Sequence, residues 1–382
     1  MLQLRPDADT GNGGPPTFGA WSDDRRVATL LIRVDTLASA LQVTVADPVL
    51  CTLEQSGELL RAVVAHARTI PVPHVEIATV DPLLRDDARR TGFECHLRRP
   101  LRCRADEPAS ASRPADARDM ADIVASLVGV RVTVVPAPRW ISRMARGAVA
   151  GFAAMVRYNV DPQDGRPALA VTVPDRADAI PESVALTVDV ALSVRRRFGA
   201  AIDHLQTLSF DHSSHGLKGG QLAGEAHANA SIISLNASYV LAAYLEEDRR
   251  HSPSVSAAGD RALLPPPFTS LERTTAHELW HQIEATFEAR RYRESIEFRR
   301  QLGDHLGVET LEHAIRGRHA DAPPPWRAAQ GRLVEEVSDY GGTLPGEATA
   351  EMFKDWWCPV TDLSPTVARF GELVDRYFPA SR

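Results

Sequence analysis

The chain has 382 residues, of which 44% are hydrophobic and 24% charged, and it carries a formal net charge of −7. This composition is globular, with room for two domains, and it shows no basic stripe with interleaved aromatics, so neither nucleic acid nor an anionic membrane is expected as a partner. The N-terminus lacks the pattern of a secretory signal and no apolar run of about 18 residues occurs, which predicts a soluble, cytoplasmic protein.

The first hundred residues alternate strand and helix patterns. Strands are predicted at 26–34, 41–47 and 74–80 and an amphipathic helix at 56–70, followed by a short helix, a Gly-Phe turn and a last strand. This order, with RRTGFE closing the short helix, resembles the second half of the Gcn5-related N-acetyltransferase fold. That family binds coenzyme A at a basic, glycine-rich loop, a pattern that the matching stretch ADPVLCTLEQSGELL lacks. We therefore favour a non-catalytic accessory domain over a working acetyltransferase.

A change of composition divides the chain. Residues 105–119 are rich in Pro, Ala, Ser and Asp without an apolar period, which predicts a linker between a domain at 1–104 and a second domain at 120–382. The second domain should begin with a helix at 120–129, a strand at 130–137, a packed helix at 141–156, a strand at 168–175 and a helix at 181–199. Segment 227–240 alternates like an exposed strand.

Several metal-capable side chains are not expected to bind metal. The four cysteines are Cys51, Cys95, Cys103 and Cys358. Each stands alone, which predicts reduced thiols instead of disulfides or a thiolate zinc site. The stretch 210–220 holds His212 and His215 beside glycines, and we interpret it as a flexible loop near a cleft and not as a second metal site. Three further histidines are expected to face solvent: His305, His313 and His319.

The stretch TTAHELWHQIEATF (274–287) places His277 and His281 four positions apart, with Glu278 beside the first. Helix positions i and i+4 share one face, so both imidazoles can converge on one ion while Glu278 reaches a water at an open position. The ion would lower the pKa of that water, and the carboxylate could take its proton. The surrounding segment 270–292 is compatible with a helix that has Ser270 as a plain N-cap. The alternative is a pair of surface histidines on an amphipathic helix.

A catalytic site of this kind needs a third ligand, which one helix cannot supply. No H-x-x-G-x-x-H continuation follows His281, so the three-histidine type is excluded. Further along, EEVSDYGGTLPGEATAEMFKDWW (335–357) carries Glu347 and Glu351 four apart on a predicted helix, and Tyr340 stands seven residues before Glu347.

HELWH joined to SDYGGTLPGEATAEMF resembles the gluzincin metallopeptidases, within them the branch typified by anthrax lethal factor. The resemblance implies these roles: zinc ligands His277, His281 and Glu347, general base Glu278, oxyanion donor Tyr340, and Glu351 as the carboxylate that orients a ligand histidine. Thr349 stands where the family usually has phenylalanine, a change that should alter packing more than coordination. If Glu347 is not the third ligand, Glu351 and then Glu336 are the next choices.

These patterns predict an α+β protein. The resemblances imply a small α/β acetyltransferase-like domain followed by a zincin-like domain, in which a mixed sheet with an edge strand lies over the active-site helix and a mainly helical subdomain follows. Segment 227–240 would be this edge strand, which in zincins pairs with extended substrate. The alternative is that 227–240 is an ordinary half-buried strand.

The expected function is Zn²⁺-dependent hydrolysis of a peptide or protein substrate by metal-activated water. One alternative is a zinc hydrolase that acts on a small peptide-like metabolite in a biosynthetic pathway. Another is a non-catalytic binding protein stabilised by zinc, which would hold its ion with four protein ligands and leave no open position.

Overall fold

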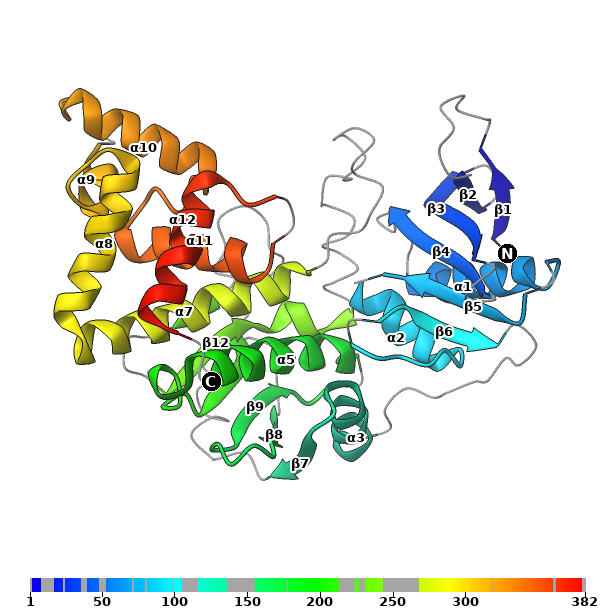
Figure 1. The fold of residues 1–382 in the computed structure, drawn as a ribbon. Helices are drawn as coiled ribbons and strands as arrows, with labels where there is room; N and C mark the ends of the chain where they lie inside the picture. Colours follow the sequence, from blue (N-terminus) through cyan, green and yellow to red (C-terminus); the bar gives the residue numbers. More distant parts are fainter. Residues whose placement is uncertain are drawn as a thin grey trace.

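The computed structural model describes residues 2–7, 17–22, 25–35, 40–47, 53–70, 72–79, 81–97, 99–104, 116–135, 155–176, 178–212, 224–226, 231–242, 268–317, 319–359 and 362–379. These residues form a mixed α+β protein with two six-stranded sheets and a C-terminal group of helices (Figure 1). Within them, no helix is both long and apolar enough to cross a membrane.

The first sheet contains the strands in chain order: β1 (Gln3–Pro6), β2 (Thr17–Ser22), β3 (Arg25–Asp35), β4 (Ala40–Asp47), β5 (His74–Ala78) and β6 (Leu101–Arg104). All neighbours are antiparallel except β4 and β5, because helix α1 (Leu53–Ala67) connects these two in a crossover. Strands β3, β4 and β5 and helix α1 confirm the predicted elements. Helix α2 (Pro82–Arg90) begins at Asp81, whose carboxylate accepts hydrogen bonds from the amides of Leu83 and Leu84.

The second sheet has the order β11-β12-β10-β9-β8-β7. Its strands are β7 (Arg131–Val135), β8 (Met155–Asp161), β9 (Leu169–Pro174), β10 (Thr207–His212), β11 (Gly224–Ala226) and β12 (Ile232–Asn236). The central strands β9, β10 and β12 are parallel, and the outer pairs are antiparallel. Helix α3 (Ala117–Val128) precedes β7, and helix α5 (Pro181–Phe198) connects β9 to β10. Short 3-10 turns follow α5 (Gly199–Ala201) and β12 (Ala237–Val240).

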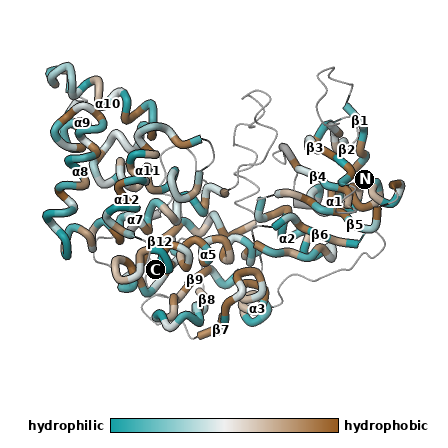
Figure 2. The backbone as a smooth tube through the Cα atoms, in the orientation of Figure 1, coloured by the Kyte–Doolittle hydropathy of each residue, from teal (hydrophilic) through white to brown (hydrophobic). Residues whose placement is uncertain are grey.

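The C-terminal helices are α7 (Ser270–Arg290), α8 (Tyr292–Leu306), α9 (Leu311–Arg316), α10 (Pro324–Glu336), α11 (Pro345–Trp357) and α12 (Pro365–Tyr377). Helix α7 is central, because it contacts α5 and strands β11 and β12 on one side and α8 and α11 on the other (Figure 1). Trp280 of α7 is fully buried and stacks on Phe353 of α11, with ring centroids 4.8 Å apart. Figure 2 shows much hydrophobic colour along α5 and much hydrophilic colour along α8, as expected for a buried and a peripheral helix.

Four predictions about local structure were wrong in detail. Residues 155–156, predicted as the end of a helix, begin strand β8, and the rest of that helix, up to 154, lies outside the described residues. Residues 210–212 belong to β10 instead of a loop; His215 lies outside the described residues. Residues 117–119, assigned to the linker, are helical because Asp116 caps α3 through the amides of Arg118 and Asp119, while 105–115 lie outside the described residues.

The fourth concerns the predicted exposed strand at 227–240. Residues 232–236 form β12, which is paired on both sides, with β10 and with β11, whereas 237–240 form a 3-10 turn instead of a strand and 227–230 lie outside the described residues. On this side the outermost described strand of the sheet is therefore β11, which has three residues and contacts α7. A segment this short carries no detectable alternation, so sequence patterns could not indicate it.

The two sheets belong to units that meet where α2 contacts α5. Arg89 of α2 pairs with the buried Glu182 of α5 at 2.9 Å. Leu83 of α2 packs with Ile180, which precedes α5, and with Ala242.

Candidate metal centre

Helix α7 positions the two histidines of the HELWH motif. It begins at Thr269 in a capping box: the Thr269 hydroxyl accepts from the Glu272 amide, and the Glu272 carboxylate accepts from the Thr269 amide at 2.7 Å. The predicted N-cap at Ser270 is therefore wrong by one residue, because the T-x-x-E spacing starts at Thr269. The rings of His277 and His281 lie on the same side of α7 with centroids 4.9 Å apart.

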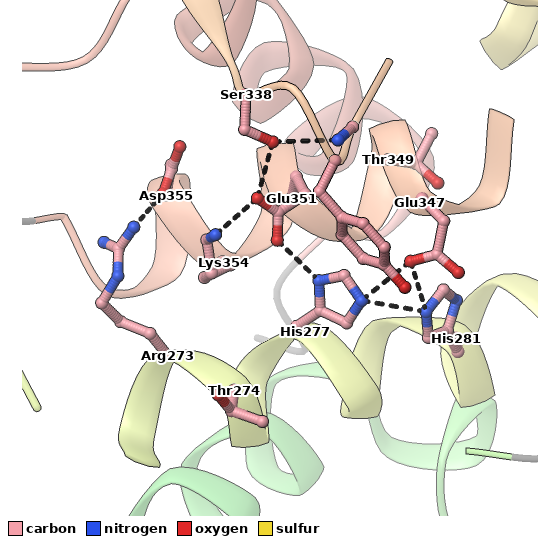
Figure 3. Close-up of polar contacts among 12 residues, drawn as sticks. Arg273, Thr274, His277, His281, Ser338, Glu347, Thr349, Glu351, Lys354 and Asp355 are labelled. Carbon is pink, nitrogen blue, oxygen red and sulfur yellow. Dashed lines mark hydrogen bonds and ion pairs between the residues drawn. The ribbon is translucent and has the colours of Figure 1, made fainter. Parts of the chain in front are cut away.

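Helix α11 brings a carboxylate to these imidazoles. Pro345 occupies the start of the helix, and Glu347 lies in its first turn. An oxygen of Glu347 lies 3.1 Å from Nε2 of His277 and 3.5 Å from Nε2 of His281, and the two nitrogens are 3.2 Å apart (Figure 3). Within the described part of the chain, these are the residues whose ligand atoms approach one another closely enough to hold a metal ion.

The spacing of the three ligand atoms fits a tetrahedral ion. Nitrogen and oxygen ligands bound at about 2.0–2.1 Å in tetrahedral geometry lie about 3.3 Å from one another. The three observed separations, 3.1, 3.2 and 3.5 Å, lie on both sides of that value. Two imidazoles and one carboxylate are also a donor set that suits a divalent transition metal.

Glu351 holds His277 from the opposite side of its ring. One oxygen of its carboxylate lies 3.0 Å from Nδ1 of His277, and the other accepts hydrogen bonds from Ser338 at 2.7 Å and Lys354 at 2.6 Å. An acceptor at Nδ1 places the proton there, which leaves Nε2 of His277 free to coordinate a metal. Figure 3 shows Glu351 and Glu347 extending from α11 toward the histidines of α7.

The loop before α11 is tied to the same carboxylate. Ser338 donates to Glu351 and accepts from the amide of Gly341, which fixes the turn that carries Tyr340. The ring of Tyr340 lies 5.9 Å from that of His277, and the residue remains 51% exposed. A phenol at the edge of the cluster with half its surface accessible can meet a bound molecule.

Burial and charge perturb the pKa values across the cluster. Burial alone would lower the pKa of His277, but Glu347, Glu351 and Glu278 outweigh it and raise that pKa to about 9. Burial likewise opposes ionisation of the two carboxylates, yet the histidines hold the pKa of Glu347 well below its usual range, and His277 with Lys354 lowers that of Glu351 to about 2. Burial and the charge of Glu347 raise the pKa of Tyr340 to about 12.

Glu278 belongs to this cluster as well. It is buried, with 6% exposure, and its charge contributes to the raised pKa values of both His277 and Tyr340. The structure therefore brings together all six side chains that the two motifs singled out: His277, Glu278, His281, Tyr340, Glu347 and Glu351.

The other metal-capable residues lie elsewhere. Glu336 accepts hydrogen bonds from the amide and hydroxyl of Thr366 at the start of α12. The group of ligand atoms close enough to hold an ion contains Glu347 and does not contain Glu336. Of the three histidines expected to face solvent, His319 does, but His305 and His313 are partly buried, and His313 stacks on Trp326. Cys95, Cys103 and Cys358 are free thiols, as predicted for them, and Cys51 lies outside the described residues.

Sequence reasoning missed one polar group beside the cluster. The buried carboxylate of Glu284 on α7 accepts a hydrogen bond from Thr349 of α11 at 3.0 Å. Its position three residues after His281, on the helix that carries the motif, was the available signal.

No family model, no curated protein and no solved structure matches the chain. A functional conclusion therefore rests on the geometry of this cluster.

Proposed function

We propose that the chain is a zinc-dependent metallopeptidase of the gluzincin type. The observation that carries the proposal is the triangle of ligand atoms from His277, His281 and Glu347, with sides of 3.1, 3.2 and 3.5 Å. Residues from two helices separated by about seventy positions meet at the spacing of a tetrahedral zinc site. Three protein ligands would leave the fourth position for a water or a substrate.

In this proposal His277, His281 and Glu347 hold the ion. When bound, zinc supplies Lewis acidity, which polarises the substrate carbonyl and lowers the pKa of water toward neutrality. Glu278, next to His277 in sequence, would take the proton of the attacking water and deliver it to the leaving amine. The water oxygen would bond to the carbonyl carbon as the C–N bond breaks, and the proton of the new carboxyl group would also pass to the amine, so the products are a carboxylate and an ammonium group.

Tyr340 would stabilise the negative charge that develops on the carbonyl oxygen. Its raised pKa of about 12 keeps the phenol protonated at neutral pH, so it can donate a hydrogen bond. Ser338 and Glu351 hold the turn that carries it. The strand β11 contacts α7 and is the outermost strand on its side of the sheet among the described residues. It supports a peptide substrate, because the edge of a sheet can bind an extended chain.

The exposure of Tyr340 favours catalysis over a purely structural ion. A structural zinc site closes all four positions with protein ligands, whereas the described residues offer three ligands here, beside a tyrosine that is 51% exposed. A small peptide-like metabolite remains the alternative substrate to a protein.

For the unit that contains the first sheet, we propose a non-catalytic accessory role. Binding of acetyl-coenzyme A, measured by calorimetry, would contradict that assignment.

The proposal is tested with Glu278→Gln. Removing a general base costs about 10²–10⁴ in rate, so this variant should lose peptide hydrolysis. It should bind zinc like the wild type, because Glu278 is not one of the three ligands. Cleavage profiling against a proteome-derived peptide library, with the variant as control, also reports the substrate. Equal cleavage by both proteins, or no zinc in protein purified without chelator, would refute the proposal.

A further inference from the structure

A buried carboxylate connects three helices beside the metal centre. Glu284 lies one turn after His281 on α7 and is 7% exposed. It accepts hydrogen bonds from the Thr349 hydroxyl of α11 at 3.0 Å and from the Arg299 guanidinium of α8 at 3.2 Å. The proposed mechanism does not use the carboxylate of Glu284.

The contact with α11 falls on the turn that carries the candidate ligand. Thr349 lies between Glu347 and Glu351 in sequence, and its hydroxyl is also within reach of the carbonyl of Gly346 at 3.0 Å. The carboxylate of Glu284 also accepts from the Arg299 guanidinium, and a carboxylate oxygen is a stronger acceptor of that single proton than a backbone carbonyl. The second oxygen of Glu284 faces Gly346, since a Cβ built there would lie 3.7 Å from it. A negative charge at the first turn of a helix is favoured by the helix dipole.

Burial makes this contact selective for one arrangement of the helices. A carboxylate removed from water is costly unless hydrogen-bond donors surround it. Arg299 supplies the counter-charge and is itself held by Glu288 and by Glu312. Glu284 therefore keeps its partners only while α11 stays at its present distance from α7 and α8.

We infer that Glu284 and Thr349 are positioning residues, which set the distance between Glu347 and the two histidines and thereby the affinity for the metal. The inference rests on the proposed metal centre. Thr349 then contributes to coordination indirectly, by fixing α11. Metal sites tolerate ligand displacements of only about 0.2 Å, so a small shift of α11 matters.

The test compares Thr349→Val, which keeps the shape but removes the donor, with Thr349→Ser, which keeps the donor. Metal-free full-length protein is titrated with Zn²⁺ in competition with a chromophoric chelator, and with Co²⁺ to record its visible spectrum. Loss of a group that supports a ligand costs about 10–100-fold in metal affinity. We expect T349V to bind Zn²⁺ at least about tenfold more weakly, with a changed Co²⁺ spectrum, and T349S to restore both.

Two further variants make the outcome decisive. Glu297→Gln, at a carboxylate of α8 that pairs with Arg300, is the matched control and should leave metal binding unchanged. Glu284→Gln removes the buried charge and should weaken binding as T349V does, which covers the case in which T349V fails to fold. If T349V and E284Q both bind Zn²⁺ like the wild type, the positioning role is wrong and the metal centre stands. If the wild type itself binds no Zn²⁺ or Co²⁺, the proposed function and this inference both fall.

Discussion

Replacing Glu351 with glutamine tests how the second glutamate supports His277. One oxygen of the Glu351 carboxylate lies 3.0 Å from Nδ1 of His277. The other accepts hydrogen bonds from Ser338 at 2.7 Å and from Lys354 at 2.6 Å. The amide oxygen of glutamine can still accept from His277, but its NH₂ group would face Lys354, donor against donor. The charge-assisted hydrogen bond from Lys354, which contributes about 1.5–3 kcal/mol, is lost. Because the Lys354 side chain is 19% exposed, water can hydrate the ammonium and offset part of that loss.

The larger effect should be on metal binding. With a neutral partner, the imidazole of His277 is a weaker base, and a loss of about 10–100-fold in affinity corresponds to about 1.4–2.8 kcal/mol. Chelator competition with Zn²⁺ at neutral pH measures this directly, and urea unfolding of the metal-free protein measures the structural part. Glu335→Gln, at an exposed carboxylate of α10, is the matched control. Wild-type affinity in E351Q would show that Glu351 does not prepare His277 for a metal.

Three other substitutions probe separate parts of the account. Tyr340→Phe should leave zinc binding intact and lower kcat for peptide hydrolysis by about 10²–10³ with little change in KM; an unchanged kcat would remove Tyr340 from the mechanism. Arg195 is 1% exposed and its three side-chain nitrogens have no hydrogen-bond partner in the described structure, so Arg195→Met should raise the free energy of unfolding by about 1–3 kcal/mol in urea titration, and a decrease would contradict this. Burial and Asp86 raise the pKa of Glu182 from 4.5 to about 7, and a raised folded-state pKa gives stability that is complete below pH 4.5 and lost as the pH rises through 7. The stability of the wild type relative to Glu182→Gln should therefore fall as the pH rises through this range, and a difference independent of pH would refute the assignment.

The parts of the site that follow from local geometry could be predicted from the sequence. The i, i+4 spacing of His277 and His281 requires only that the segment be helical, and the spacing of Glu347 and Glu351 requires the same of α11. That these two helices meet is a property of tertiary packing, in which Trp280 stacks on Phe353. No periodicity encodes that contact, so the third ligand was predicted from a resemblance between motifs.

The errors have local physical causes. Strands β1 and β2 went unpredicted because neither alternates: no residue of β1 is fully buried, and the two buried residues of β2 are adjacent. The alternation of β12 predicts an edge strand at 227–240, whereas the shorter strand β11 pairs with the outer edge of β12. Glu284 was overlooked because a carboxylate on a helix is usually solvated, and only its donors, Thr349 and Arg299, explain why it is buried.

X-ray absorption at the zinc edge of full-length protein loaded with one equivalent of zinc tests the central claim most directly. We predict two imidazole nitrogens, one carboxylate oxygen and one solvent oxygen at about 2.0–2.1 Å, and loss of the carboxylate in Glu347→Gln. A sulfur ligand at about 2.3 Å, or a first coordination sphere with fewer than two imidazoles, would contradict a site built from His277, His281 and Glu347.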